Sequence, residues 1–159
     1  MKKTFIDLDL INLNLEAQDK IEAIKILSGK LYEKGKVKTS FFNAVLDREK
    51  KFPTGLKTKF ISFALPHADS KHVNSAGVAV GLLKKPVKFK SMEDPDNNVN
   101  VKLIVLLAVK DKSKQVIVLQ NLIKMMQNKI TTQNILSSND DKELLLLFQN
   151  NLFVKNNNY

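Results

Sequence analysis

The sequence contains no cysteine and only one arginine, Arg48, among 159 residues. The lack of cysteine excludes a disulfide framework, a thiol nucleophile and any zinc site built on cysteine, and it agrees with a reducing compartment such as the cytoplasm. No stretch approaches the roughly 18 uninterrupted apolar residues of a membrane span, so we expect none. The N-terminus carries two lysines but no uncharged apolar run after them, which argues against a signal peptide.

Several catalytic motifs are also missing. The chain has no G-x-S-x-G nucleophile elbow, no phosphate-binding P-loop and no dinucleotide fingerprint. Its two histidines, His67 and His72, lie five residues apart with one aspartate nearby, and this set offers too few ligands for a metal site. We therefore expect no bound nucleotide and no metal.

The chain is strongly basic, with 26 basic and 16 acidic residues and a formal charge of +10. Such a charge raises nucleic acid as a possible partner. The lysines are scattered rather than clustered, however, and the reading of bases usually relies on arginine. A solvated basic surface is the favoured interpretation, and we expect no nucleic-acid partner. A basic, non-catalytic binding module remains the alternative.

The hydrophobic pattern predicts an α/β protein, a three-layer α/β/α sandwich in which helices flank a small mixed β-sheet. We expect one domain over residues 1–159, with a core at about 4–153 and a frayed tail at 154–159. The expected elements, in chain order, are a strand within 4–15, a helix from Glu16 ended by Gly35, a helix from Thr39 that stops before Pro53, strands at 60–65 and 76–83, a turn at 84–86, strands at 87–89 and 101–109, and helices from Asp111 or Ser113, at 131–136 and at 140–153. In the helix from Asp111 or Ser113, the expected inward stripe is Val116, Leu119, Ile123 and Met126, and Met125 and Met126 are expected to fill the core.

Both histidines and the single arginine fall between Arg48 and His72. The apolar run at 60–65 predicts a buried strand, and Pro66 should end it because proline cannot donate a hydrogen bond to the sheet. His67 is then the first side chain beyond the strand. In open α/β sheets reactive groups collect at this position, so His67 is our candidate for the chemistry.

A neutral imidazole can attack phosphorus and hold the phosphoryl group as a labile P–N adduct. Such a histidine needs donors for the phosphoryl oxygens and a permanent cation. The loop after residue 66 can supply backbone N–H groups, Asp69 or Ser70 could orient a ring nitrogen, and Arg48 offers a planar fork suited to phosphate. The plainer alternatives are a loop-capping His67, a surface Arg48, and a His72 that faces either the same pocket or solvent.

Four motifs between residues 48 and 115 resemble those of one protein family. They are Arg48-Glu49 followed by Phe-Pro-Thr-Gly-Leu at 52–56, Ala-Leu-Pro-His at 64–67, Val-Ala-Val at 78–80 before Pro-Val-Lys-Phe at 86–89, and the apolar strand 103–108 leading to Gln115. Together they resemble the IIA component of the bacterial phosphoenolpyruvate-dependent sugar phosphotransferase system (PTS), in its fructose–mannitol superfamily. The runs at 52–55 and 66–72 are most similar to galactitol-type IIA proteins.

The resemblance implies a phosphotransferase component with the same sandwich fold. His67 would accept a phosphoryl group on Nε2 from the histidine phosphocarrier protein HPr and pass it to a cysteine of the IIB component, which serves a membrane IIC component. Arg48 would stabilise the phosphate, with His72 as possible support and Thr54, Asp69 and Ser70 in supporting positions. No cofactor is implied beyond the covalent phosphohistidine, and the imported sugar or polyol is galactitol-like by similarity.

Two features depart from the family pattern. Mannitol-type members carry a further histidine where this chain has Lys112-Ser113-Lys114, and the positive charge is unexpected for an acceptor of the basic phosphocarrier protein. Docking would then rely on an apolar patch from Phe63 and Leu65, or on acids such as Asp69 and Glu49. A regulatory IIA-like domain, phosphorylated as a signal, is the enzymatic alternative.

Overall fold

The longest apolar run in the sequence forms the central strand of a mixed sheet. The computed structural model describes residues 5–152. In this part of the chain five strands lie in the order β1-β4-β5-β3-β2, and β5 pairs antiparallel with β4 and parallel with β3. The elements are a short 3-10 helix η1 (Leu8–Leu10), β1 (Ile11–Leu15), α1 (Lys20–Glu33), α2 (Phe41–Lys51), β2 (Gly55–Lys57), β3 (Ser62–Ala64), a second 3-10 helix η2 (Ser70–His72), β4 (Gly77–Lys90), β5 (Asn98–Ala108), α3 (Lys112–Gln127), α4 (Lys129–Leu136) and α5 (Asp141–Asn151).

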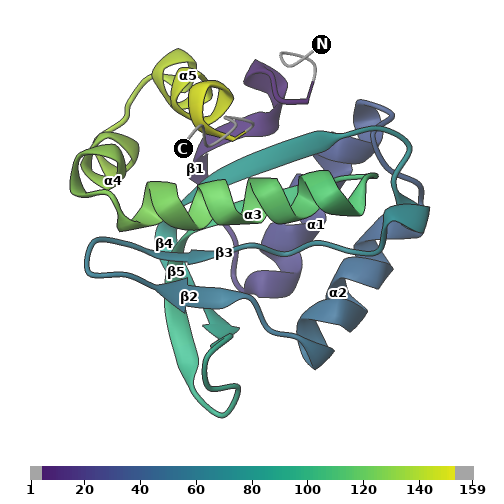
Figure 1. Ribbon diagram of the computed structural model, residues 1–159. Coiled ribbons are helices and arrows are strands. Elements are labelled where there is room, and N and C mark those ends of the chain that lie inside the picture. The colour runs from purple at the N-terminus through teal and green to yellow at the C-terminus, as the bar shows by residue number, and fades with distance from the viewer. Residues whose placement is uncertain (1–4, 153–159) are drawn as a thin grey trace.

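Helices cover both faces of this sheet (Figure 1). On one face α1 packs against β4 and contacts α2. On the other face α3 crosses the strands, with α4 and α5 packed against it. Between these layers β5 is buried without interruption from 103 to 108, as expected of a strand covered on both sides. The predicted three-layer α/β/α sandwich is confirmed.

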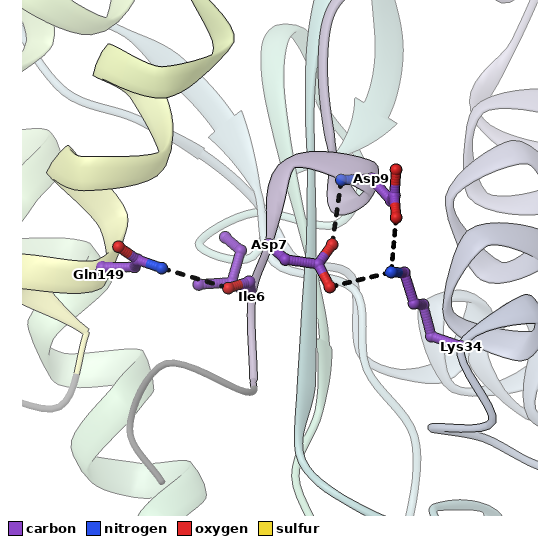
Figure 2. Close-up of polar contacts among 5 residues, drawn as sticks. All are labelled: Ile6, Asp7, Asp9, Lys34 and Gln149. Carbon is purple, nitrogen blue, oxygen red and sulfur yellow. Dashed lines mark hydrogen bonds and ion pairs between the residues drawn. The ribbon is translucent and has the colours of Figure 1, made fainter.

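The segment before β1 connects helices from the two layers (Figure 2). The side-chain amide of Gln149 on α5 donates to the carbonyl of Ile6 at 3.4 Å, and the ammonium of Lys34, just after α1, pairs with Asp7 at 3.0 Å and with Asp9. The Asp7 carboxylate also caps η1, so the opening strand is shorter than predicted and begins at Ile11. The ion pairs are solvent-exposed, and their main effect is to set the position of the segment rather than to add stability.

β4 runs straight through the segment that was expected to turn. The predicted turn at 84–86 is wrong, because residues 77–90 form one strand. The pairing register with β5 shifts between Leu82 and Val87, and Pro86 lies inside this interruption. A proline cannot donate to a strand ladder, but it is tolerated where a bulge leaves the ladder open. The strand segments predicted at 76–83 and 87–89 are thus both present, but the chain between them changes its pairing register and not its direction.

The buried face of α3 is rotated relative to the prediction. Val116, which was expected to face the core, is 53% exposed, whereas Val118, Leu122 and Met125 are buried. Both sets of residues repeat at three and four positions, so spacing alone could not decide between them. Packing against α4 and α5 decides which face is buried. Met126 is fully buried, so both methionines fill the core as predicted.

The helix ends follow their capping residues. α1 begins at Lys20 rather than Glu16, because the Asp19 carboxylate accepts the backbone N–H of Glu22 at 2.9 Å. It ends at Glu33, and Gly35 follows the C-cap residue with φ +70°, a value that glycine adopts without strain, so the predicted role of Gly35 in stopping the helix is confirmed. The predicted tail at 154–159 lies outside the described residues. Within 5–152, no helix is both long and apolar enough to cross a membrane.

Candidate functional site

His67 lies at the edge of the sheet where the parallel strands β3 and β5 end. β3 stops at Ala64, but the chain continues beside β5: the backbone N–H of Leu107 donates to the carbonyl of Pro66 at 3.0 Å, and residue 67 forms an isolated bridge with residue 107. The carboxyl ends of parallel strands meet at one edge of a sheet, which is where α/β folds gather functional groups. The backbone on both sides of this position is thus fixed by the central strand.

The ring of His67 is held by its own backbone neighbourhood. Nδ1 lies 2.8 Å from the carbonyl oxygen of Leu65. A carbonyl can only accept a hydrogen bond, so Nδ1 carries a proton and, in the neutral ring, Nε2 keeps its lone pair. Burial lowers the pKa of His67, the hydrogen bond to Leu65 works against this shift, and the positive charge of Arg48 adds to it. The residue is 9% exposed, so it is mostly buried but not sealed.

Arg48 lies at the exposed end of α2, close enough to act on His67 electrostatically. Its guanidinium carbon lies over the ring of Phe52 at 5.4 Å from the centroid, which is a cation–π contact. The positive charge of Arg48 contributes to the lowered pKa of His67, so the cation and the imidazole that the sequence singled out lie within electrostatic range of each other. Their separation of 19 positions in the chain is closed by β2 and β3.

Thr54 and Glu49 lie beneath this pair. Glu49 is the neighbour of Arg48, but it points inward and is only 3% exposed. Its carboxylate accepts the backbone N–H of Thr54 at 2.8 Å and the Thr54 hydroxyl at 2.9 and 3.1 Å. The Thr54 hydroxyl in turn accepts the backbone N–H of Leu65 at 3.2 Å. Burial raises the pKa of Glu49, and the hydrogen bonds from Thr54 oppose that shift.

Asp69 and Ser70 have partners within their own loop. The Asp69 carboxylate caps η2 by accepting the backbone N–H of Lys71 at 3.1 Å, and the Ser70 hydroxyl donates to Asp69 at 3.4 Å. These hydrogen bonds and the charge of Lys112 lower the pKa of Asp69. The expectation that one of the two orients a ring nitrogen of His67 is corrected, because the carbonyl of Leu65 holds Nδ1.

His72 is engaged at the start of α2. Its Nδ1 forms a hydrogen bond with the hydroxyl of Ser40 at 2.8 Å, and its carbonyl accepts the backbone N–H of Lys38 at 2.9 Å. These contacts tie the loop after His67 to the N-terminus of α2. His72 therefore helps to hold the loop in position. Its possible support of the chemistry stays a prediction.

The expected docking surface needs correction. Phe63 and Leu65 are each only 1% exposed, and Glu49 is buried, so none of the three can meet a partner. The exposed apolar side chains on the elements around the site are Phe52, beside Arg48, and Val116 with Ile117 in the first turns of α3. Asp69 is exposed, as the docking idea required. Among residues 5–152, no three histidine or acidic side chains are grouped so that they could hold a metal ion.

The sequence did not point to two of these groups. The carbonyl of Leu65 is a backbone acceptor, and no side-chain pattern marks which carbonyl a nearby ring will find. Glu49 was expected among the acids available for docking, and it is buried instead. Helical phase could have corrected this, since Glu49 lies four residues after the buried Val45 and therefore on the same face.

The described part of the chain is thus a three-layer α/β/α domain with a histidine at the carboxyl edge of its mixed sheet. The chain belongs to the phosphoenolpyruvate-dependent sugar phosphotransferase system EIIA 2 family, whose model matches residues 4–151. It is thus a IIA domain of a sugar phosphotransferase system, and the family resemblance read from the motifs is confirmed.

Two relatives and one solved structure illustrate the similarity. The galactitol-specific EIIA component of Escherichia coli K12 is 28% identical over 109 residues, covering 69% of this chain and 72% of its own length. The transcriptional regulator ManR of Bacillus subtilis is 30% identical over 105 residues, which are 66% of this chain but 15% of that protein. The complex of enzyme IIAMTL with phosphorylated enzyme IIBMTL from Escherichia coli matches with a TM-score of 0.74 and 24% identity, over 91% of this chain and 97% of that one.

Proposed function

We propose that this IIA domain is a phosphohistidine carrier. It accepts a phosphoryl group on Nε2 of His67 from the histidine phosphocarrier protein HPr and passes it to a cysteine of the IIB component. That relay supplies uptake of a galactitol-like sugar or polyol through the membrane IIC component. The observation that carries the proposal is the 2.8 Å hydrogen bond from Nδ1 of His67 to the carbonyl of Leu65, which leaves the other nitrogen free to attack.

The first transfer needs a neutral imidazole. The lone pair of Nε2 attacks phosphorus, the P–N bond to the donor's imidazole breaks, and the electron pair leaves on the donor nitrogen. The His67 ring gains positive charge as the new P–N bond forms. The carbonyl of Leu65, which accepts from Nδ1–H, stabilises that charge. Arg48 stabilises the phosphoryl oxygens as they pass between the two rings.

The second transfer uses the same bonds in reverse order. A thiolate of the IIB component attacks phosphorus, the bond from phosphorus to Nε2 breaks, and His67 returns to its neutral form with Nδ1 still protonated. The solved complex of a mannitol IIA with a phosphorylated IIB supports a IIB protein as the acceptor, because that IIA shares this fold. Phe52, Val116 and Ile117 are the exposed apolar groups available for such a contact.

The proposal needs no bound cofactor, since the phosphoryl group is held covalently. It takes residues 1–159 as one carrier domain working in the cytoplasm, where phosphoenolpyruvate and the phosphocarrier protein are available. The 28% identity to a galactitol-specific EIIA component supports a sugar alcohol as the transported substrate. Asp69 and Ser70 shape the loop that follows His67, and Thr54 anchors the strand that precedes it.

A relay experiment tests the function. The protein is incubated with labelled phosphoenolpyruvate, enzyme I and HPr, and label on the chain is then chased with a galactitol-type IIB protein. We expect one phosphoryl group per chain, stable to base and labile to acid as a phosphoramidate is, and its transfer to the IIB cysteine. Label that forms but cannot move to any IIB protein would contradict the transport role.

A regulatory role is the second candidate, and the match to ManR favours it. The matched region forms 15% of that transcriptional regulator, so a domain of this type occurs within a regulatory protein. In this case His67 would be phosphorylated as a signal and would not feed a transporter. The chase with IIB separates the two candidates, because a signalling domain keeps its label.

The pH dependence of phosphoryl acceptance follows from the environment of His67. Burial lowers its pKa below the ordinary value of about 6.5, so the neutral, attacking form persists to lower pH. We expect a constant rate from about pH 8 to below pH 6.5, with loss only as the pH falls through the lowered pKa. The stability contributed by the depressed pKa is present above the unfolded value and is lost over the same fall.

An NMR titration of the His67 ring measures this pKa independently of the donor's own titration. Agreement between the ring's midpoint and the midpoint of the rate profile supports the assignment. A ring that titrates at or above pH 6.5 would contradict it.

A further inference from the structure

A continuous series of hydrogen bonds leads from His67 to a buried acid. Nδ1 of His67 donates to the carbonyl of Leu65 at 2.8 Å, and the N–H of the same Leu65 donates to the Thr54 hydroxyl at 3.2 Å. That hydroxyl donates to the carboxylate of Glu49 at 2.9 Å. Leu65 is therefore held from both of its backbone polar groups, one by the imidazole and one by Thr54.

We propose that Glu49 is a positioning residue for phosphoryl transfer: through Thr54 it fixes the backbone of Leu65, and so fixes the tautomer and orientation of the His67 ring. This inference rests on the proposed role of His67 as the phosphorylated residue. Glu49 is linked to the ring through Thr54 and Leu65.

The direction of the series is set by the carboxylate. A threonine hydroxyl has one proton to donate, and it can accept through its lone pairs. Because an ionised carboxylate only accepts, Glu49 takes the proton of Thr54 and leaves a lone pair facing the N–H of Leu65. All of the hydrogen bonds that Glu49 makes here are accepted ones, which fits the ionised form.

The hydroxyl of Thr54 takes the place of a strand carbonyl as the acceptor for the backbone N–H of Leu65. β2 and β3 pair from Gly55 opposite Ala64, so the next residues outward are Thr54 and Leu65. At this point the Thr54 side chain, rather than a strand carbonyl, receives the N–H of Leu65. Beyond Leu65 the carbonyl of Pro66 is held by the N–H of Leu107. The peptide groups before and after the critical carbonyl are thus each anchored.

The free-energy cost of burying the Glu49 carboxylate also supports a specific role for this residue. A carboxylate that is 3% exposed is desolvated, and burial raises its pKa accordingly. An apolar residue at this position of α2 would avoid that cost. Hydrogen-bonded groups behind a reactive side chain commonly contribute about 10- to 100-fold to activity by orienting it, as they do around metal ligands. A small displacement of the attacking atom has an effect of similar size, about 100-fold.

The test compares Glu49→Gln and Thr54→Val with Thr54→Ser, using Glu33→Gln on the exposed surface of α1 as the matched control. Nitrogen-15 NMR of the unphosphorylated ring reports which nitrogen carries the proton. We expect the wild type, Thr54→Ser and the control to hold the proton on Nδ1, and the other two variants to shift toward Nε2–H. The rate of phosphoryl acceptance from HPr should fall about 10- to 100-fold in those two only.

The outcomes separate a positioning role from a structural one and from failure of the function itself. An unchanged tautomer or an unchanged rate in Glu49→Gln overturns the inference, and amide spectra show whether each variant is folded. Should Thr54→Val not fold, Glu49→Gln alone decides, because it preserves size and keeps one acceptor. A wild type that takes no phosphoryl group at all would instead overturn the proposed function, whatever its tautomer.

Discussion

Replacing His67 with glutamine should abolish phosphoryl acceptance, lowering the rate by more than about 1,000-fold. Glutamine occupies similar space, but its amide lies where Nε2 stands rather than where Nδ1 stands, and its nitrogen has no basic lone pair with which to attack phosphorus. The hydrogen bond from Leu107 to the carbonyl of Pro66 does not involve this side chain, so we expect the strand end to keep its place. Rapid-quench measurement of label transfer from HPr gives the rate, and thermal unfolding checks that the fold is kept.

His72→Gln is the matched control, since it makes the same change at the other histidine of the chain. His72 is bound to Ser40 at the start of α2, so we expect its loss to loosen the loop and to reduce the rate far less. An equal loss of rate in both variants would place His72 in the reacting centre and contradict its assignment as a residue that only positions the loop. Label remaining in His67→Gln at wild-type stoichiometry would show that another residue is phosphorylated.

The fold could be predicted where one physical signal dominates. An almost wholly apolar run predicts the central strand at 101–109, which is observed at 98–108, because only a strand covered on both faces tolerates such a sequence. Glycine at 35 follows the end of α1 for reasons of backbone geometry, and Asp111, one of the two predicted caps, begins α3 by accepting a backbone N–H. The cap at Asp19 was missed, since the first helix was expected from Glu16. Where two signals compete, as at Pro86, local chemistry indicated a turn and the pairing of β4 with β5 overrode it.

The site was predictable as a set of residue types but not as an arrangement. Proline before histidine marked the strand end, and a single arginine in a lysine-rich chain marked a place where a planar fork matters. The group that orients the ring is a backbone carbonyl at Leu65, and no residue type encodes it. Glu49 shows the same limit, because its burial depends on how α2 is rotated against the sheet and on the position of Thr54.

His67 and Arg48 are held by different parts of the domain. The ring is held from inside the sheet through Leu65, whereas Arg48, the cation that we propose stabilises the phosphate, lies outside on the exposed end of α2. A partner can therefore reach Arg48 and Phe52 without disturbing the bonds that fix the tautomer. In the proposed relay two different proteins use His67 in turn, and neither has to orient its ring.

Arg48→Ala should lower the rate of phosphoryl acceptance by about 100- to 1,000-fold, the range found when one stabilising donor is removed from a reacting centre. Arg48→Lys restores charge but not the planar pair of donors, nor the stacking over Phe52, so only partial recovery is expected. Removal of the positive charge also raises the pKa of His67, because that charge helps to lower it. Rapid-quench kinetics and an NMR titration of the ring measure the two effects.

Lys51→Ala is the control for charge alone, since Lys51 is an exposed cation in the same last turn of α2. We expect it to change the salt dependence of docking but to leave the single-turnover rate at saturating donor nearly unchanged. If Arg48→Ala and Lys51→Ala behaved alike, Arg48 would be one of several surface cations and not a group aimed at the phosphoryl oxygens. Full activity in Arg48→Lys would lead to a narrower conclusion, that the charge matters at this position and the fork does not.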